Sequence, residues 1–205
     1  MIGYQLSINA AHHPDVVAVV YGARRLTYAE LNARACRLAN GLAALGVGPS
    51  DRVAVLLHNC NQFLEALFAT AKLGAVFVPV NFRLVAREVG ALLDACQPKV
   101  LLAGEGFADL LATLVAQTTF PEHVIWADDR LPAEPSPEPG HPYETWLAAQ
   151  RAEEPADIVQ RDAVQMLLHS SGTTGLPKGI IVILMPRRSR RRWRRSSTSG
   201  SRHPM

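Results

Sequence analysis

The chain has 205 residues, of which 48% are hydrophobic and 19% are charged, and its formal net charge is +3. This composition excludes a disordered polar chain, and the length is sufficient for one or two domains with a buried core. The sequence has no apolar run of about 18 residues and no basic, apolar leader at its start, so we expect no membrane span and a cytoplasmic location.

Short apolar strands alternate along the chain with amphipathic helical patterns. In chain order, strands are predicted over residues 16–21 (followed by a turn at 22–25), 52–58, 75–80, 99–103, 123–126, 163–168 and 180–184. The helical patterns between them cover residues 27–46, 61–74, 84–96, 107–117 and 143–150. This alternation favours an α/β fold in which a mostly parallel sheet is flanked by helices.

The starts of three helices differ in how well their first residues can cap them. Thr27 and Glu30 have the spacing of a capping box, which predicts a well-defined helix start. Asn59 or Asn61 can cap the next helix, because asparagine accepts hydrogen bonds from free backbone N–H groups. Val85 occupies the expected cap position of the third helix and offers no such acceptor.

We expect one partial domain over residues 1–184 and a tail over residues 185–205. Residues 128–142 hold five of the 14 prolines, which predicts an exposed loop inside the domain. The three cysteines are widely spaced, and neither they nor the seven histidines have the spacing of metal ligands. We therefore expect buried, reduced thiols and no metal site built from these side chains.

Residues 169–179, HSSGTTGLPKG, carry the most specific chemistry in the chain. Glycines bring backbone N–H groups close to an anion, hydroxyls donate to phosphate oxygens, and lysine adds a positive charge. The segment does not match the nucleotide loop G-x-x-x-x-G-K-[ST], because Pro177 precedes Lys178 and Gly179 follows it. A flexible linker is the alternative, but linkers rarely hold Pro-Lys-Gly directly after an apolar strand.

This segment resembles the [ST]-S-G-T-T-G-x-P-K-G signature of the adenylate-forming, AMP-binding superfamily. Three earlier segments resemble the N-terminal part of its acyl-CoA synthetases in the same order, namely LTYAELN at 26–32, LGVGPSDRVA at 45–54 and AKLGAVFVPVNFRL at 71–84. The NFRL ending of the last segment is more similar to fatty-acid or aromatic-acid CoA ligases than to peptide-synthetase adenylation domains. The resemblance covers about residues 14–182.

The resemblance implies an activity and a set of site residues. Members of this family activate a small carboxylic acid with Mg²⁺ and ATP, which yields an acyl-adenylate and pyrophosphate, and most then form a thioester with coenzyme A. Lys178 is the residue to which the resemblance gives a catalytic role, and His169 could pack beneath the loop. The β- and γ-phosphates of ATP, and the pyrophosphate that leaves, would be bound by Ser170, Ser171, Gly172, Thr173, Thr174, Gly175 and Lys178.

The last residues differ from the rest of the chain in composition. All 18 Asp and Glu residues precede Ile180, whereas eight arginines follow it. From Pro186 on, the Arg/Ser-rich sequence resembles a GC-rich coding strand read out of frame, so we expect a disordered tail and a truncated, frameshifted ligase. Nucleic-acid binding by this tail is a weaker alternative, because the tail has one aromatic residue and no recognition fold.

Three functions therefore stay open at this point. The first is a truncated acid–CoA ligase that is inactive alone, since the later family segments for adenine, ribose, the acyl group and coenzyme A are not found in the sequence. The second is a residual ATP- or pyrophosphate-binding module without turnover. The third changes the acceptor, so that the chain would be part of an adenylation domain that loads a carrier protein.

Overall fold

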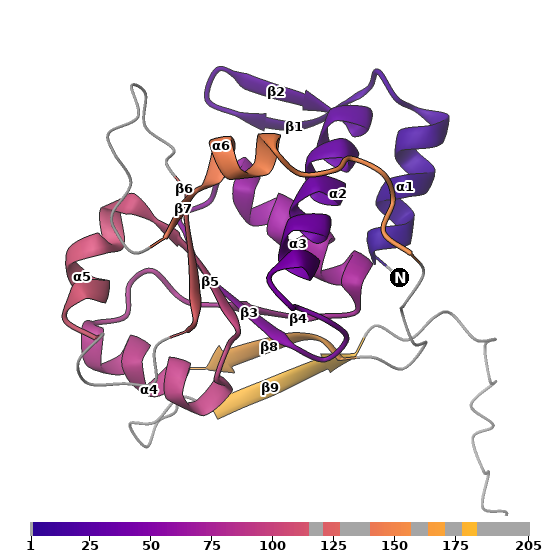
Figure 1. The fold of residues 1–205 in the computed structure, drawn as a ribbon. Coiled ribbons are helices and arrows are strands. Elements are labelled where there is room, and N and C mark those ends of the chain that lie inside the picture. Colours follow the sequence, from indigo (N-terminus) through magenta and orange to yellow (C-terminus); the bar gives the residue numbers. More distant parts are fainter. Residues whose placement is uncertain (1, 115–120, 128–139, 157–163, 171–177, 184–205) are drawn as a thin grey trace, which may run out of the picture.

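A seven-stranded sheet forms the centre of the fold (Figure 1). The computed structural model of the protein describes residues 2–114, 121–127, 140–156, 164–170 and 178–183. The strands of the sheet are β3 (Arg52–Leu56), β4 (Val76–Pro79), β5 (Val100–Gly104), β6 (His123–Ala127), β7 (His141–Pro142), β8 (Val164–Ser170) and β9 (Lys178–Ile183). They lie in the order β7-β6-β5-β3-β4-β8-β9, and only the β8–β9 pair is antiparallel. The predicted α/β fold with a mostly parallel sheet is confirmed.

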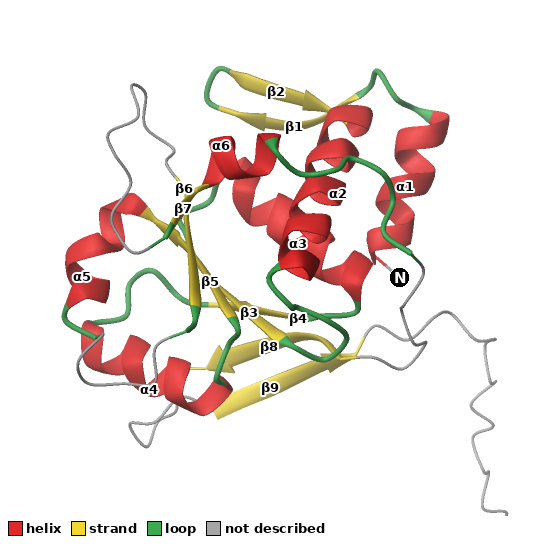
Figure 2. Ribbon diagram, viewed as in Figure 1, coloured by secondary structure: helices red, strands yellow, loops and turns green. Residues whose placement is uncertain are grey.

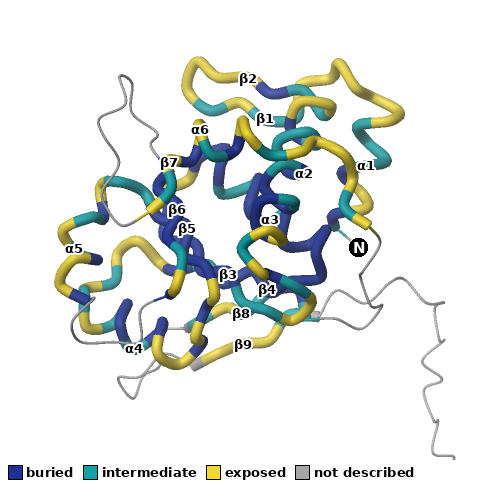
Figure 3. Tube along the Cα trace, in the orientation of Figure 1, coloured by how far each residue is buried: buried dark blue, intermediate teal, exposed yellow. Residues whose placement is uncertain are grey.

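Helices cover both faces of the sheet (Figure 2). One face packs against α2 (Tyr28–Ala44), α3 (Asn61–Leu73) and α6 (Tyr143–Ala148), and the other packs against α4 (Ala86–Cys96) and α5 (Ala108–Ala112). Successive residues of a strand point to opposite faces, so Val53 and Val55 pack on the first set of helices and Ala54 and Leu56 on the second. The central strands β3, β4 and β5 are consequently buried except for one partly exposed residue at an end of each, whereas most described residues of β9 are exposed (Figure 3).

Two N-terminal elements differ from the sequence-based expectations. A helix, α1 (Ile2–His12), packs against α2 and α3, although the sequence predicted no element there. Only Gly3 and Leu6 of this helix are buried, so its sequence carries no clear apolar stripe that would have predicted a helix. A hairpin of β1 (Val17–Tyr21) and β2 (Arg24–Thr27) follows it, so the turn predicted over residues 22–25 was too long.

The helix caps follow the sequence at α2 but not at α3. At the start of α2, the Thr27 hydroxyl accepts from the Glu30 N–H at 3.3 Å and Glu30 accepts from the Thr27 N–H at 2.8 Å, which confirms the capping box. The cap of α3 is Cys60, which makes no side-chain capping bond, so the prediction of Asn59 or Asn61 was wrong. Asn61 lies inside the helix, where its amide donates to another side chain of the same helix.

The other predicted elements are present with ends shifted by a few residues, as is common for assigned boundaries. The predicted helix over residues 107–117 is represented by the 3-10 turn Glu105–Phe107 and by α5, and its last residues lie outside the described residues. Most of the proline-rich segment 128–142 and the whole tail 185–205 also lie outside them.

A buried polar network joins α2, α3 and α6. Glu65 of α3 has no exposed surface and accepts from Arg34 Nε at 2.8 Å, from Asn61 Nδ2 at 2.7 Å and from the Tyr143 hydroxyl at 2.5 Å. Arg34 also donates to both carboxylate oxygens of Glu144, at 2.8 and 3.0 Å. Burial and the charge of Glu65 raise the pKa of Tyr143 well above its ordinary value, so the phenol stays a hydrogen-bond donor.

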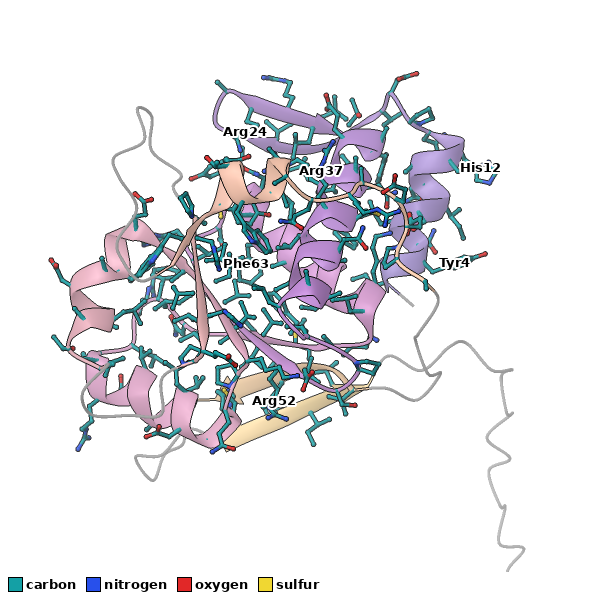
Figure 4. The ribbon with its side chains drawn as sticks, in the orientation of Figure 1. Tyr4, His12, Arg24, Arg37, Arg52 and Phe63 are labelled. Carbon is teal, nitrogen blue, oxygen red and sulfur yellow. The ribbon has the colours of Figure 1, made fainter. Side chains whose placement is uncertain are left out.

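The same layer also holds the segment that leads towards β8. Lys72, with a side chain only 4% exposed, pairs with Glu154 at 2.7 Å. Asn40 of α2 donates to the backbone carbonyls of Arg151 and Glu153 at 2.8 and 2.9 Å. Arg24 of β2 extends towards α6 and donates to Glu144 at 3.4 Å (Figure 4). These contacts fix residues 143–154 against the helices before the chain returns to the sheet.

The carboxylates of this layer make the stability of the fold sensitive to acid. Partial burial opposes the ionisation of Glu144, but hydrogen bonds from Arg34 outweigh it and hold the pKa of Glu144 below its ordinary value of 4.5. The unfolded chain therefore takes up this proton first as the pH falls. The stabilisation from Glu144 is complete above about pH 4.5 and is lost as the pH falls through the lower pKa of the folded state.

We therefore expect the free energy of unfolding to fall as the pH drops through and below about 4.5, and Glu144→Gln to flatten part of this slope. Urea unfolding across this range measures it. The control variant is Glu153→Gln, whose carboxylate is 70% exposed and pairs only loosely with Arg151, and it should keep the wild-type slope. Equal slopes for Glu144→Gln and the wild type would contradict the expectation.

Candidate functional site

The two strands that flank the hydroxyl-rich segment form a hairpin at one end of the sheet. β8 pairs in parallel with β4, with Phe77 opposite Met166, and β9 returns antiparallel to β8. The pairing register places His169 opposite Gly179 and Ser170 opposite Lys178. The backbone therefore brings Ser170 and Lys178 directly opposite each other, where the connecting residues 171–177 begin and end.

The residues predicted to bind polyphosphate divide between described and undescribed positions. Ser170 ends β8 and Lys178 begins β9, whereas the sequence had predicted these strands over 163–168 and 180–184. The hairpin therefore reaches further towards the loop than expected. The remaining predicted positions lie outside the described residues, namely Ser171, Gly172, Thr173, Thr174 and Gly175.

His169 is half-buried on β8 and directly precedes Ser170, the last residue of that strand. Its Nδ1 atom is buried and has no hydrogen-bond partner among the described residues. Burial lowers the pKa of His169 below its ordinary value of 6.5, so the ring is neutral at neutral pH. A Cβ atom on Gly179 would lie 3.3 Å from Leu167 and 3.9 Å from His169, so the glycine lets the two strands and their side chains pack closely here.

The hairpin opens at the carboxyl edge of the sheet. Because β3, β4, β5, β6 and β8 are mutually parallel, the residue that follows each strand lies at the same edge as Ser170. In open α/β sheets this edge is where ligands bind. The position of the hydroxyl-rich segment therefore agrees with a binding role.

Sequence reasoning missed a cation at this edge. Arg83 follows β4, the strand next to β8, and it is exposed, with its guanidinium carbon 5.7 Å from the centre of the Phe82 ring. Its backbone N–H donates to the side chain of Asn81 at 3.0 Å, which forms a tight turn after the strand. The signal available in the sequence was an arginine in the turn that follows an apolar strand. Its place beside β8 could not be predicted, because it depends on the order of the strands in the sheet.

Clustered metal ligands and membrane-spanning helices are both absent from the part of the chain that the structure describes. There, no group of three or more His, Cys, Asp or Glu side chains could hold a metal ion. All three cysteines are buried and none forms a disulfide, and burial raises the pKa of Cys36 and Cys96 to about 11. No helix among these residues has both the length and the apolar character of a membrane span.

Comparison with known proteins identifies relatives along most of the chain. Residues 6–183 match the family model of the AMP-binding enzymes. A feruloyl-CoA synthase from Amycolatopsis is 41% identical over 174 residues, which are 85% of this chain and 31% of that protein. The long-chain-fatty-acid–CoA ligase FadD13 of Mycobacterium tuberculosis is 37% identical over 182 residues, or 88% of this chain and 34% of the ligase.

Solved structures agree with these sequence matches. The N-terminal domain of FACL13 from Mycobacterium tuberculosis superposes with a TM-score of 0.75 at 34% identity, over 89% of this chain and 44% of that one. The anthranilate CoA ligase AuaEII in complex with anthranoyl-AMP superposes with a TM-score of 0.80 at 27% identity, over 87% of this chain and 34% of that ligase.

The chain spans about a third of the length of the curated relatives it matches, 31% of the synthase and 34% of the ligase. The match to the family model extends from within α1 to β9, the strand that follows the hydroxyl-rich segment. Because the family model matches residues 6–183 and relatives match nearly all of the described length, the chain belongs to the family of AMP-binding enzymes.

Proposed function

We propose that this chain carries the ATP-polyphosphate-binding part of an acid–CoA ligase. One observation supports the proposal most strongly: the β8–β9 hairpin sets Ser170 opposite Lys178 at the carboxyl edge of the sheet, at the two ends of a segment rich in glycine and hydroxyl groups. Backbone N–H groups and hydroxyls suit phosphate oxygens, and lysine supplies a charge that they attract.

The chemistry that this site would serve is the activation of a carboxylate. The carboxylate oxygen attacks the α-phosphorus of ATP, the bond to the β-phosphate breaks, and pyrophosphate leaves. Negative charge then grows on the leaving oxygen, so a lysine and aligned N–H donors lower the barrier by stabilising that charge. Mg²⁺ would accompany ATP as part of the substrate and neutralise phosphate oxygens.

In the second step, the thiol of coenzyme A would attack the acyl carbon and release AMP. The proposed acids are fatty or aromatic, because relatives of this chain are named as feruloyl-CoA and long-chain-fatty-acid–CoA ligases. Since the chain spans about a third of those proteins, we propose polyphosphate binding for this chain itself and the complete ligase reaction for a full-length enzyme.

The assignments within the loop are part of this proposal. Lys178 would contact the phosphate oxygens that become pyrophosphate, and the other contacts would come from the hydroxyls and backbone of Ser170, Ser171, Gly172, Thr173, Thr174 and Gly175. Arg83 lies one strand away at the same edge and would add to the positive potential there. His169, neutral and half-buried on β8, would pack against the residues of this segment.

Titration calorimetry on the full chain with Mg²⁺ tests the proposal through the length of the phosphate chain. ATP and pyrophosphate should compete for one site, and each should bind at least about tenfold more tightly than AMP, because AMP lacks the two phosphates that the loop would hold. Equal binding of AMP and ATP, or binding of ATP that pyrophosphate does not displace, would assign the affinity to another part of the chain.

A further inference from the structure

A second feature of the carboxyl edge lies away from the phosphate loop, where the chain changes direction across the sheet. From β3 the chain passes through α3 to β4 on one side, and it then passes through α4 to β5 on the other side of β3. Helices leave neighbouring strands towards opposite faces at such a point, which opens a crevice outside the strand ends. The crevice of this sheet lies between β3 and β5.

A hollow of about 310 Å³ occupies this crevice. Its lining comes from the residues that end or follow β3, β5 and β6, together with the start of α3, and consists of Leu57, His58, Cys60, Gln62, Gly104, Gly106, Phe107 and Ala127. None of these lining residues is Lys, Arg, Asp or Glu, so the walls favour a neutral, largely apolar occupant.

One side chain in the lining, Gln62, has a buried carbonyl oxygen without a hydrogen-bond donor among the described residues. Gln62 lies in the first turn of α3 and is only 1% exposed, yet its Oε1 atom has no hydrogen-bond partner among the described residues. A buried carbonyl without a donor is destabilising, and most buried polar side-chain atoms in proteins are paired. An N–H or O–H group placed in the hollow would supply the donor.

Two aromatic side chains, His58 and Phe107, belong to the lining of the hollow. The ring of His58 lies between Phe82, at 4.7 Å, and Phe107, at 5.0 Å, and it is nearly parallel to Phe107, with an angle of 25° between the ring planes. A flat face of this kind favours another ring as the apolar part of a ligand. Gly104 borders the same space, because a Cβ atom there would lie 3.4 Å from Phe107 and 3.6 Å from Leu57.

We propose that this hollow is a binding site for a neutral, ring-sized molecule that donates a hydrogen bond to Gln62 Oε1. The site is separate from the phosphate loop, since β4 lies between β3 and β8 and two strand spacings place the ends of β3 and β8 roughly 10 Å apart. It also differs in chemistry, because Lys178 and the hydroxyls suit an anion whereas the walls of the hollow suit a neutral ring.

Benzamide is the probe for this site. N,N-dimethylbenzamide is a control that lacks a hydrogen-bond donor, and benzoate is a control that carries a negative charge on the same ring framework. NMR titration of the full chain should show benzamide shifting the backbone signals of His58, Gly104, Gly106 and Ala127. The shifts should saturate at a dissociation constant on the order of millimolar, as for a small fragment. The two other compounds should bind at least about fivefold more weakly, since one lost hydrogen bond accounts for that factor.

Two variants test the site itself. Gly104→Val should abolish the shifts by filling the space between Leu57 and Phe107. Gly48→Ala is the control, because Gly48 precedes β3 at the opposite edge of the sheet and a Cβ atom there would meet only Asp51, at 3.8 Å. This variant should bind as the wild type does. Gln62→Leu keeps the size of the side chain, removes the unpaired carbonyl, and should weaken benzamide about fivefold without unfolding the chain.

The proposal is overturned if benzamide shifts none of these signals, if N,N-dimethylbenzamide or benzoate binds as tightly as benzamide, or if Gln62→Leu leaves the affinity unchanged. The affinity of Gln62→Leu for benzamide tests the proposal even if Gly104→Val fails to fold. ATP added to the same samples should leave benzamide binding in place, so a failure here leaves the proposed polyphosphate site untouched, and the reverse also holds.

Discussion

Replacing Glu65 with alanine is expected to destabilise the fold by about 3–5 kcal/mol, the largest effect of any single substitution considered. The carboxylate is fully buried and accepts hydrogen bonds from Arg34, Asn61 and Tyr143. Its removal leaves Arg34 Nε, the Asn61 amide and the Tyr143 hydroxyl without this acceptor, although Arg34 keeps its ion pair with Glu144. Three donors left without an acceptor, together with the cavity left by the side chain, account for the size of the effect.

Urea unfolding followed by circular dichroism measures this change. The control is Glu153→Ala, which removes an exposed carboxylate from the same helical layer and should cost no more than about 1 kcal/mol. A triple variant, Arg34→Met with Glu65→Leu and Tyr143→Phe, removes three of the four polar side chains of the network, leaves Asn61, and should recover part of the loss. A cost for Glu65→Ala close to that of the control would contradict the role given to the network.

Replacing Lys178 with alanine is expected to weaken the binding of Mg·ATP and of pyrophosphate about ten- to a hundredfold. This range corresponds to the loss of one charge-assisted contact to phosphate, which contributes about 1.5–3 kcal/mol. AMP binding should change little, because the proposed contact is to phosphates that AMP does not have. The expected pattern is therefore a selective loss rather than a general one.

Lys99→Ala is the matched control, since it also removes one lysine but at the opposite edge of the sheet. Lys99 precedes β5, and its ammonium group donates to the backbone carbonyl of Gly46 at 2.6 Å and to Asp51 at 2.8 Å. Calorimetry should give the same ATP affinity for Lys99→Ala as for the wild type. Equal losses in the two lysine variants would show only a general effect of positive charge and would count against a contact at Lys178.

The parts of the fold that the sequence predicted are those specified by local patterns. α2 carries its own start signal in Thr27 and Glu30 and an apolar stripe over its whole length, so its limits were found almost correctly. The central strands are continuous apolar runs because both of their faces are buried, which is the pattern of a parallel sheet. The strand order could not be predicted, since it depends on which helix crosses which face.

The parts that were missed depend on distant residues. α1 is held by packing against α2 and α3 rather than by its own amphipathicity. The cap of α3 is Cys60, a buried core residue that makes no side-chain capping bond. The network around Glu65 joins residues that are 31 and 78 positions away in the sequence, at Arg34 and Tyr143. No spacing rule connects such partners before the fold is known.

Of the two candidate sites, one is specified by consecutive residues and the other by residues that are distant in the sequence. The phosphate loop was predicted because its glycines, hydroxyls and lysine are consecutive in the sequence, and the structure adds the pairing of Ser170 with Lys178. The hollow beside Gln62 was not predicted, because its walls come from three strand ends that only the sheet brings together. Its one local signal, a glutamine in the first turn of α3, is too common to interpret alone.

The central claim is that the segment between β8 and β9 holds the polyphosphate of ATP. The most direct measurement is an NMR titration of the ¹⁵N-labelled full chain with Mg·ATP, which reports on every backbone N–H group. We predict that the largest shifts fall on residues 170–179 and that Lys178→Ala removes them. Shifts centred elsewhere, or a loop whose signals do not move at saturating Mg·ATP, would contradict the account.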